Sequence, residues 1–426
     1  MKQLSTFVLI ALTIVVSAFY LPMLYEKLFF ERILKTHLLY SPVTERFIFK
    51  EKIVGPIPQE AQLKAEDHHA EIAYRDANGD YYTRVEFEKN LPFIYYRNME
   101  LWGLLPLRFG DQEFGKKEIK ENRQVLELKF SDISDLHPQT PLWPLLESNP
   151  SQARLVFPED RFRMTSNAME FVNADYNKVD EELTSKFTNA LNEKGFVFPA
   201  RSVHGKFTIL KPFDEGAFIV DNQYQVFHVK RRNGDPWVIK TDIDPKLKTR
   251  HIKVSENRRR KYYGLLLAGT NDLHLLTTGN YGLIRLPLED YQPNKMDFKL
   301  LINPLYQTAV YSDETTIRGV AMDSDFTPID RYTHSMSRSI KTNTHLVHEI
   351  FFPFAGYLKQ SGGAFLNLSL QLGSSLSFIG IAVCLVGFGA WSWLRRQRFP
   401  KAIEVCVVAV TGIYGVIAVS MLDLED

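Results

Sequence analysis

The stretch Leu372–Lys401, LGSSLSFIGIAVCLVGFGAWSWLRRQRFPK, decides what kind of protein this chain is. Its first part, through Leu394, carries no charge and is long enough as a helix to cross roughly 30 Å of bilayer hydrocarbon. Its last seven residues hold four cations: Arg395, Arg396, Arg398 and Lys401. Such clusters stay on the cytoplasmic side of a membrane, so these residues determine the topology of the helix that precedes them.

A second apolar segment lies at the N-terminus. Gln3 to Tyr25 contains no charge, and its apolar composition predicts a spanning helix. The alternative is a cleaved signal peptide, with Lys2 as its charged start and Val16-Ser17-Ala18 as its cleavage site. The apolar character continues past this site, which favours the helix. Both interpretations export the residues that follow.

A third apolar segment, Val405–Leu422, predicts a third transmembrane helix that forms a hairpin with the second. With the cationic connector inside, the N-terminus also lies inside and residues from about 26 to 370 lie outside. We therefore expect a protein of the bacterial inner membrane whose N-terminus is cytoplasmic and whose large domain is periplasmic.

The composition narrows the possible partners and chemistry. With 51 basic and 50 acidic side chains the net charge is +1, so no global field draws nucleic acid, and we expect none to bind. The two cysteines, Cys384 and Cys406, both lie in the C-terminal apolar region. The exported part therefore has no thiol for a disulfide, a zinc cluster or a nucleophile.

The predicted secondary structure of the exported part changes along its length. A capping box, Thr83-Arg84-Val85-Glu86, predicts a helix start, and the Asn78-Gly79 turn before it predicts a hairpin. A proline-rich stretch at 136–158 marks a boundary. Beyond it, short alternating runs such as Tyr262–Leu267 and Leu273–Thr277 predict strands, with one helix at Asp180–Glu193.

Turns recur in this β-rich part at intervals of roughly 50 residues, a period typical of propeller blades. An irregular arrangement of several sheets gives similar strands. We therefore predict a mainly β, propeller-like or irregular multi-sheet periplasmic domain with an N-terminal α/β subdomain and three transmembrane α-helices. The predicted divisions are a helix at 1–25, an α/β subdomain at 26–150, a β-rich domain at 151–345, an amphipathic approach to the membrane at 346–371 and a helical hairpin at 372–422.

Two side-chain groups are candidates for function. Histidines spaced i, i+3 on a helix could share a metal, but the string His345-Leu346-Val347-His348-Glu349 has neither order found in zinc hydrolases, so interfacial histidines are favoured. The second group is a basic run in a predicted loop that could dock an acidic partner or lipid headgroups; its members are Arg258, Arg259, Arg260 and Lys261. No phosphate loop or nucleophile elbow is present, and we predict no catalytic residues, cofactor or metal.

Several strings, taken together, resemble a known family. They include Tyr81–Phe87, Pro144–Ser148, Lys211–Gly216 and Arg250–Asn257. The resemblance is to Bacteroides-type membrane proteins catalogued as a domain of unknown function, and it covers nearly the whole chain. It implies genes beside those of an ABC transporter, and hence an accessory role. The family has no established catalytic residues to carry over.

These observations give two functional hypotheses. The first is a non-enzymatic, partner-binding subunit of an inner-membrane complex, with an ABC permease as its membrane partner. The alternative is a membrane-tethered periplasmic hydrolase or lyase that acts on envelope polymers. A deep pocket with several converging polar side chains favours the enzyme, and a pocket lined only by apolar residues would remove it.

Overall fold

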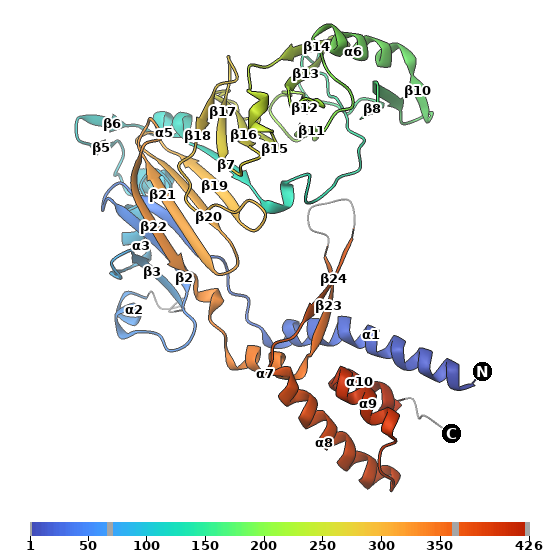
Figure 1. Cartoon of the computed structure of the whole chain (residues 1–426). Coiled ribbons are helices and arrows are strands. Elements are labelled where there is room, and N and C mark those ends of the chain that lie inside the picture. Colours follow the sequence, from blue (N-terminus) through green and yellow to red (C-terminus); the bar gives the residue numbers. More distant parts are fainter. Residues whose placement is uncertain (1, 66–70, 360–365, 422–426) are drawn as a thin grey trace. The chain divides into compact units, whose positions relative to one another are not determined.

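The chain forms two compact units, which are described separately. A computed structural model describes residues 2–65, 71–359 and 366–421. The terminal unit contains both ends of the chain, Met1–Leu34 and the stretch from Arg338 onward, and the central unit is Lys35–Ser337. Figure 1 labels the elements of both.

The central unit is built from antiparallel sheets that mostly follow one another along the chain (Figure 1). The first sheet has the order β1-β2-β3-β4, with bounds His37–Ser41, Arg46–Lys52, Ile72–Asp76 and Tyr81–Tyr82. Around it lie the helices α2 (Gln59–Lys64), α3 (Arg84–Lys89), α4 (Tyr96–Leu101) and α5 (Lys116–Asn122), and the hairpin of β5 (Leu107–Phe109) and β6 (Gln112–Phe114).

Three further sheets are simple meanders. The first consists of β8 (Asp160–Met164), β9 (Met169–Asn173) and β10 (Lys178–Asp180), followed by α6 (Glu181–Glu193). The second consists of β11 (Ser202–Gly205), β12 (Ala217–Val220), β13 (Val226–Arg232) and β14 (Asp235–Lys240). The third consists of β15 (His251–Val254), β16 (Tyr262–Leu267), β17 (Leu273–Thr277) and β18 (Leu283–Arg285).

The last sheet of the central unit joins distant parts of the sequence. Its order is β22-β21-β20-β19-β7, with bounds Pro328–Ser335, Thr316–Met322, Gln307–Ser312, Asp297–Ile302 and Gln124–Leu128. Short 3₁₀ helices are η1 (Phe130–Asp132), η2 (Pro245–Leu247) and η3 (Ser337–Ser339). Because β7 precedes β19 by more than a hundred residues, its place in the sheet could not be read from local sequence.

Apolar cores lie between neighbouring sheets. Ile219 and Phe227 pack against β8, β9 and α6 on one side, while Phe218 and Val226 pack against the third meander on the other. Because apolar cores cover both faces of its sheet, β12 is buried at every position and its sequence is a continuous apolar run. Leu275 lies in the next core, which joins the third meander to the five-stranded sheet. Among the described residues the sheets form no closed barrel, and the ring of blades stays a prediction.

Local patterns in the central unit are confirmed where they were strongest. β16 and β17 have the predicted bounds. Asp180 caps α6 by accepting from the Leu183 N–H at 2.9 Å. The capping box is present at α3, where Thr83 and Glu86 satisfy each other's backbone N–H groups.

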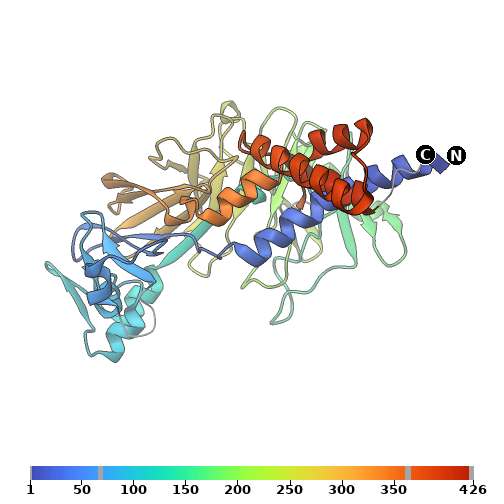
Figure 2. The same ribbon diagram turned by 90° about the horizontal axis from the view of Figure 1, so that it is seen from below.

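The terminal unit contains α1 (Lys2–Phe29), α7 (Asn343–Phe351), the hairpin of β23 (Phe354–Lys359) and β24 (Asn367–Leu372), and the C-terminal helices α8 (Ser377–Arg396), α9 (Ala402–Thr411) and α10 (Ile413–Met421). Of the C-terminal helices, α10 packs against α1, while α8 packs against α7, α9 and α10 (Figures 1 and 2). Two helices, Leu4–Phe29 and Ser377–Arg396, are long and apolar enough to cross a membrane. They suggest membrane association, and the first also fits a signal sequence.

The predicted single span Val405–Leu422 is wrong, and the number of long apolar helices in the described residues is two, not three. Gly412 has φ +59° and separates α9 from α10. A Cβ on Gly415 would lie 2.9 Å from the Val407 carbonyl oxygen, so α10 folds back onto α9. The Arg396 guanidinium donates to the Val419 carbonyl at 3.1 Å. The end of α10 thus returns to the end of α8, because a left-handed glycine redirects the chain where composition alone predicts continuity.

The second span also begins later than predicted. Leu372 is the last residue of β24, and α8 starts at Ser377. The segment 346–371, predicted as an amphipathic approach to the membrane, contains most of α7 and then the β23–β24 hairpin.

Candidate functional site

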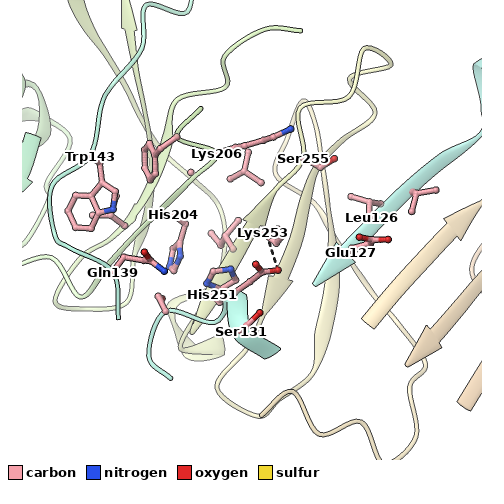
Figure 3. Close-up of a pocket in the computed structure, with 18 residues that line it drawn as sticks. Leu126, Glu127, Ser131, Gln139, Trp143, His204, Lys206, His251, Lys253 and Ser255 are labelled. Atoms are coloured by element: carbon pink, nitrogen blue, oxygen red, sulfur yellow. Dashed lines mark ion pairs between the residues drawn. The ribbon is translucent and has the colours of Figure 1, made fainter. Parts of the chain in front are cut away.

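Three sheets present an edge strand to one cavity in the central unit. The strands are β7, β11 and β15, each at the end of its sheet. They border a cavity of about 570 Å³, and the chain segment 131–143 crosses it (Figure 3). The outer side of an edge strand has no strand partner in its own sheet, and here β11 and β15 also lie against each other.

Two histidines face each other at this cavity. His204 lies on β11 and His251 on β15, with their ring centroids 5.0 Å apart and their planes nearly perpendicular. They are 2% and 8% exposed. His204 Nε2 lies 2.8 Å from the Ser202 hydroxyl, whereas His204 Nδ1 and both ring nitrogens of His251 are buried and have no hydrogen-bond partner among the residues that the structure describes. Buried polar atoms are nearly always paired in proteins, so three unpaired nitrogens at one cavity are an exception.

Both imidazoles are neutral at physiological pH. Burial lowers the pKa of His251 to about 3, and the nearby Lys253 and Arg250 add to the shift. Burial also lowers the pKa of His204 well below its usual 6.5, with a smaller effect from His251. A neutral imidazole carries one N–H donor and one acceptor nitrogen. The pair can therefore hydrogen-bond to amides and hydroxyls without introducing a charge.

The rest of the cavity is mixed in character. Lys253 forms an ion pair with Asp132 at 2.9 Å, and Glu127 pairs with Lys299 at 2.8 Å. Trp143 supplies aromatic surface at the opposite end from β7 (Figure 3), and the Phe207 ring lies 6.4 Å from it. Because charged, neutral polar and aromatic groups all line it, the cavity is not an apolar slot.

A second cavity of about 550 Å³ continues the first. It shares Ser134, Gln139, Trp143 and Val203 with the first cavity and extends past Arg201 and Arg250. Together the two cavities form a groove along β11 and β15, which we call the seam groove.

A network of buried charges lies beside the seam groove. The Lys211 ammonium, 1% exposed, donates to Asp214 at 2.6 Å, to Glu256 at 2.7 Å and to the Lys206 carbonyl at 2.7 Å. Glu256 follows β15 directly and also accepts from the Glu215 N–H at 2.9 Å. Burial raises the pKa of Glu256, while Lys211 opposes that shift. The network therefore ties the end of β15 to the segment that enters β12.

A second buried pair extends this network on β13. Lys230 pairs with Glu215. His228 shares a hydrogen bond with the Glu215 carbonyl at 2.6 Å and another with the Tyr281 hydroxyl at 2.9 Å. None of these side chains lines the seam groove. These side chains connect the second meander to Tyr281, which follows β17 of the third meander, and we assign them a positioning role.

The basic run predicted as a docking site lies in the loop between β15 and β16. Arg258, Arg260 and Lys261 are exposed, while Arg259 is half-buried. The Arg260 guanidinium stacks over Phe213 at 4.1 Å. The run is therefore not one continuous cationic surface, and its use in docking stays a prediction.

The four topology-determining cations lie at the end of α8 and in the connector after it. Arg396 and Arg398 each lie 3.3 Å from the same carboxylate oxygen of Glu404, which is fully buried, and Lys401 precedes α9 as its N-cap. Arg395 lies 5.9 Å from the Trp391 ring. Sequence reasoning counted the cations but missed Glu404 as their shared partner.

The other predicted candidates do not form a site. In α7, His345 accepts at the N-cap from Thr342 and stacks on Phe30, and His348 packs near Tyr25. In the described part of the chain, no three His, Cys, Asp or Glu side chains are grouped so that they could hold a metal. His204 and His251 were missed because they belong to different sheets and share no local motif.

A family model matches about two thirds of the chain. A family model described as "Domain of unknown function (DUF4857)" matches residues 37–322. The match begins at the start of β1 and ends with β21, so it covers the sheets of the central unit except β22 and leaves out the apolar helices. No curated protein matches the chain.

Proposed function

This chain belongs to the DUF4857 family, and on that premise we propose that it is a non-enzymatic, membrane-anchored subunit that binds a partner protein in the seam groove. The observation that carries the proposal is the meeting of three sheet edges around two buried, neutral histidines.

The seam groove suits an extended peptide. Edge strands accept an added strand through main-chain hydrogen bonds, each worth about 0.5–1.5 kcal/mol net. The free nitrogens of His204 and His251 match the donor and acceptor groups of a peptide amide. Val203 and Ile252 offer apolar surface for alternate side chains of such a strand.

The apolar helices supply the anchor. We propose that α1 and α8 cross the inner membrane with the cations Arg395, Arg396, Arg398 and Lys401 on the cytoplasmic side, which leaves the central unit in the periplasm. The proposed membrane partner is the permease of an ABC-type transporter, as the family resemblance implies. The series of face-to-face sheets with their edges at one groove also supports a propeller-like arrangement.

Site-specific photo-crosslinking in native membranes tests partner binding. A photo-reactive residue at Ser255 or Lys206, both on the cavity (Figure 3), is expected to capture one defined protein. The matched control is Asn189, an exposed position on α6 away from the groove. Capture of the same proteins at the same yield from Asn189, or no capture from the groove positions, would contradict the proposal.

A second candidate is a hydrolase or lyase that acts on envelope polymers, because Trp143, Phe207 and two carboxylates line the same cavity as the histidines. The mixed lining leaves this candidate in place. The full chain, purified and incubated with cell-wall polysaccharide, would release fragments if it were an enzyme. Release that disappears in His251→Leu would favour the enzyme over the binding subunit.

A further inference from the structure

The β23–β24 hairpin carries a row of exposed leucines. Leu358 pairs with Leu368 across the two strands, and Leu370 and Leu372 pair with Gly356 and Phe354. Paired residues in an antiparallel sheet point to the same face, so these side chains share one side of the hairpin. The leucines at 358, 368, 370 and 372 are 62%, 70%, 68% and 77% exposed. We call this side the leucine face.

Contacts with α1 set the position of the leucine face. A Cβ on Gly356 would lie 2.5 Å from the Phe19 ring, so the strand crosses α1 at that residue. On its other side, Tyr357 donates to Glu26 at 2.8 Å. Phe19 lies seven residues before Glu26, which is about 10 Å along a helix. The hairpin therefore crosses α1 within its apolar stretch, and its tyrosine reaches the first acidic residue.

The hairpin is fixed in this position at its base. The Tyr414 hydroxyl donates to the Phe354 carbonyl at 2.6 Å, and the Gly373 N–H donates to the Pro353 carbonyl at 2.8 Å. Tyr414 itself is fully buried against Ala18 of α1. The base of the hairpin thus packs against the apolar helices of the same unit, while its leucines stay exposed.

The neighbouring surface of α1 is equally apolar. Val16, Tyr20 and Met23 are 46%, 60% and 51% exposed at the same level of the helix. A soluble protein rarely exposes a continuous apolar surface of this kind, and an exposed apolar edge strand in water promotes aggregation. If α1 crosses the membrane as proposed above, its exposed apolar side chains face lipid, and the leucine face beside them lies in the same medium.

We propose that the leucine face lies in the acyl-chain region of the leaflet that surrounds the C-terminal part of α1. The hairpin is then a third membrane contact of the chain, beside α1 and α8, and it binds lipid rather than a partner protein. This inference rests on the membrane anchoring proposed above but is independent of the seam groove.

Fluorescence quenching by lipid tests this inference. The full chain, with Cys384→Ala and Cys406→Ala and one cysteine introduced at Leu370, carries an environment-sensitive dye in nanodiscs whose lipids have brominated acyl chains. We expect quenching at least threefold stronger at Leu370 than at Ser369, which points to the opposite face of β24. Val386 on α8, 75% exposed, is the reference for a lipid-facing position.

The outcomes separate the two claims. Quenching at Val386 with equal, weak quenching at Leu370 and Ser369 overturns the inference and leaves the anchoring intact. An absence of quenching at Val386 overturns the anchoring and the inference with it. A dye at Leu370 that is unquenched in nanodiscs and becomes shielded only in native membranes assigns the leucine face to a protein partner, which also overturns the inference.

Discussion

Lys211→Met removes the cation at the centre of the buried charge network and leaves two carboxylates without their counter-ion. The Lys211 ammonium lies 2.6 Å from Asp214 and 2.7 Å from Glu256, and all three side chains are at most 3% exposed. Removing one partner of a buried ion pair destabilises a protein by about 3–5 kcal/mol, because the remaining charge stays buried. This is a large share of a typical folding free energy of roughly 5–15 kcal/mol.

The loss should appear as a drop in melting temperature on the order of 10 °C. Tryptophan fluorescence of the full chain in detergent, followed during heating, measures it. The matched control is Lys116→Met, which breaks an exposed pair with Glu100 at 2.6 Å and should change stability by less than about 1 kcal/mol. Equal effects of the two variants would refute the assignment of Lys211 to a buried network.

The loss should also depend on pH. Burial raises the pKa of Glu256, and without Lys211 only the hydrogen bond from the Glu215 N–H still opposes that shift. The folded variant then holds a proton that the unfolded carboxyl, with an ordinary pKa of 4.5, releases. Stability therefore falls as pH rises above about 4.5, and part of it returns at pH 5 compared with pH 7.5. A loss that is the same at both pH values would contradict the buried-charge explanation.

Three further predictions concern the seam groove and its support. His251→Leu should change the free energy of unfolding by less than about 1 kcal/mol, because the His251 ring nitrogens make no hydrogen bond in the described part of the chain. The same variant should weaken crosslinking from the seam groove several-fold. Loss of folding in the variant would contradict the first expectation. Burial lowers the pKa of His204, and it lowers the pKa of His251 to about 3, so the unfolded chain binds protons below pH 6.5 that the folded chain does not. Stability should therefore fall as pH drops below 6.5, and His251→Leu should make that fall shallower. An equally steep fall in the variant would count against two neutral buried imidazoles. Gly264→Ala should destabilise the protein by about 2 kcal/mol more than Gly79→Ala. A Cβ at position 264 would lie 1.9 Å from the Lys253 carbonyl oxygen, whereas a Cβ at position 79 would meet nothing within 4 Å. Equal melting temperatures of the two variants would refute the close approach of β15 and β16.

Much of the fold could be predicted because its signals are local. The bounds of β16 and the cap at Asp180 depend on neighbours a few residues apart, and both are confirmed, although β16 is buried at its last four positions and does not alternate. For the same reason the sequence could predict that α1 and α8 are helices long and apolar enough to cross a membrane. The break at Gly412 could not, since a glycine in an apolar run fits either a continuous helix or a turn, and packing of Gly415 on Val407 decides between them.

The candidate site could not be predicted from the sequence because the contacts that bring its strands together are long-range. His204 and His251 meet only after two meanders pack, and β7 joins β19 across most of the central unit. Lys211 and Glu256 lay in the strings that carried the family resemblance, but nothing in those strings indicated that the two side chains pair. A histidine on a buried strand gives no signal in one sequence that separates a binding group from a core residue.

Hydrogen exchange of the edge strands tests the central claim most directly. Two samples are compared: the chain extracted gently from native membranes together with its partner, and the chain purified without the partner. Strand addition in the seam groove predicts slower amide exchange in β11 and β15 with the partner, and no change in β14 and β18, the opposite edges of the same sheets. Equal exchange of β11 and β15 in the two samples, or equal protection of all four edges, would contradict partner binding in the groove.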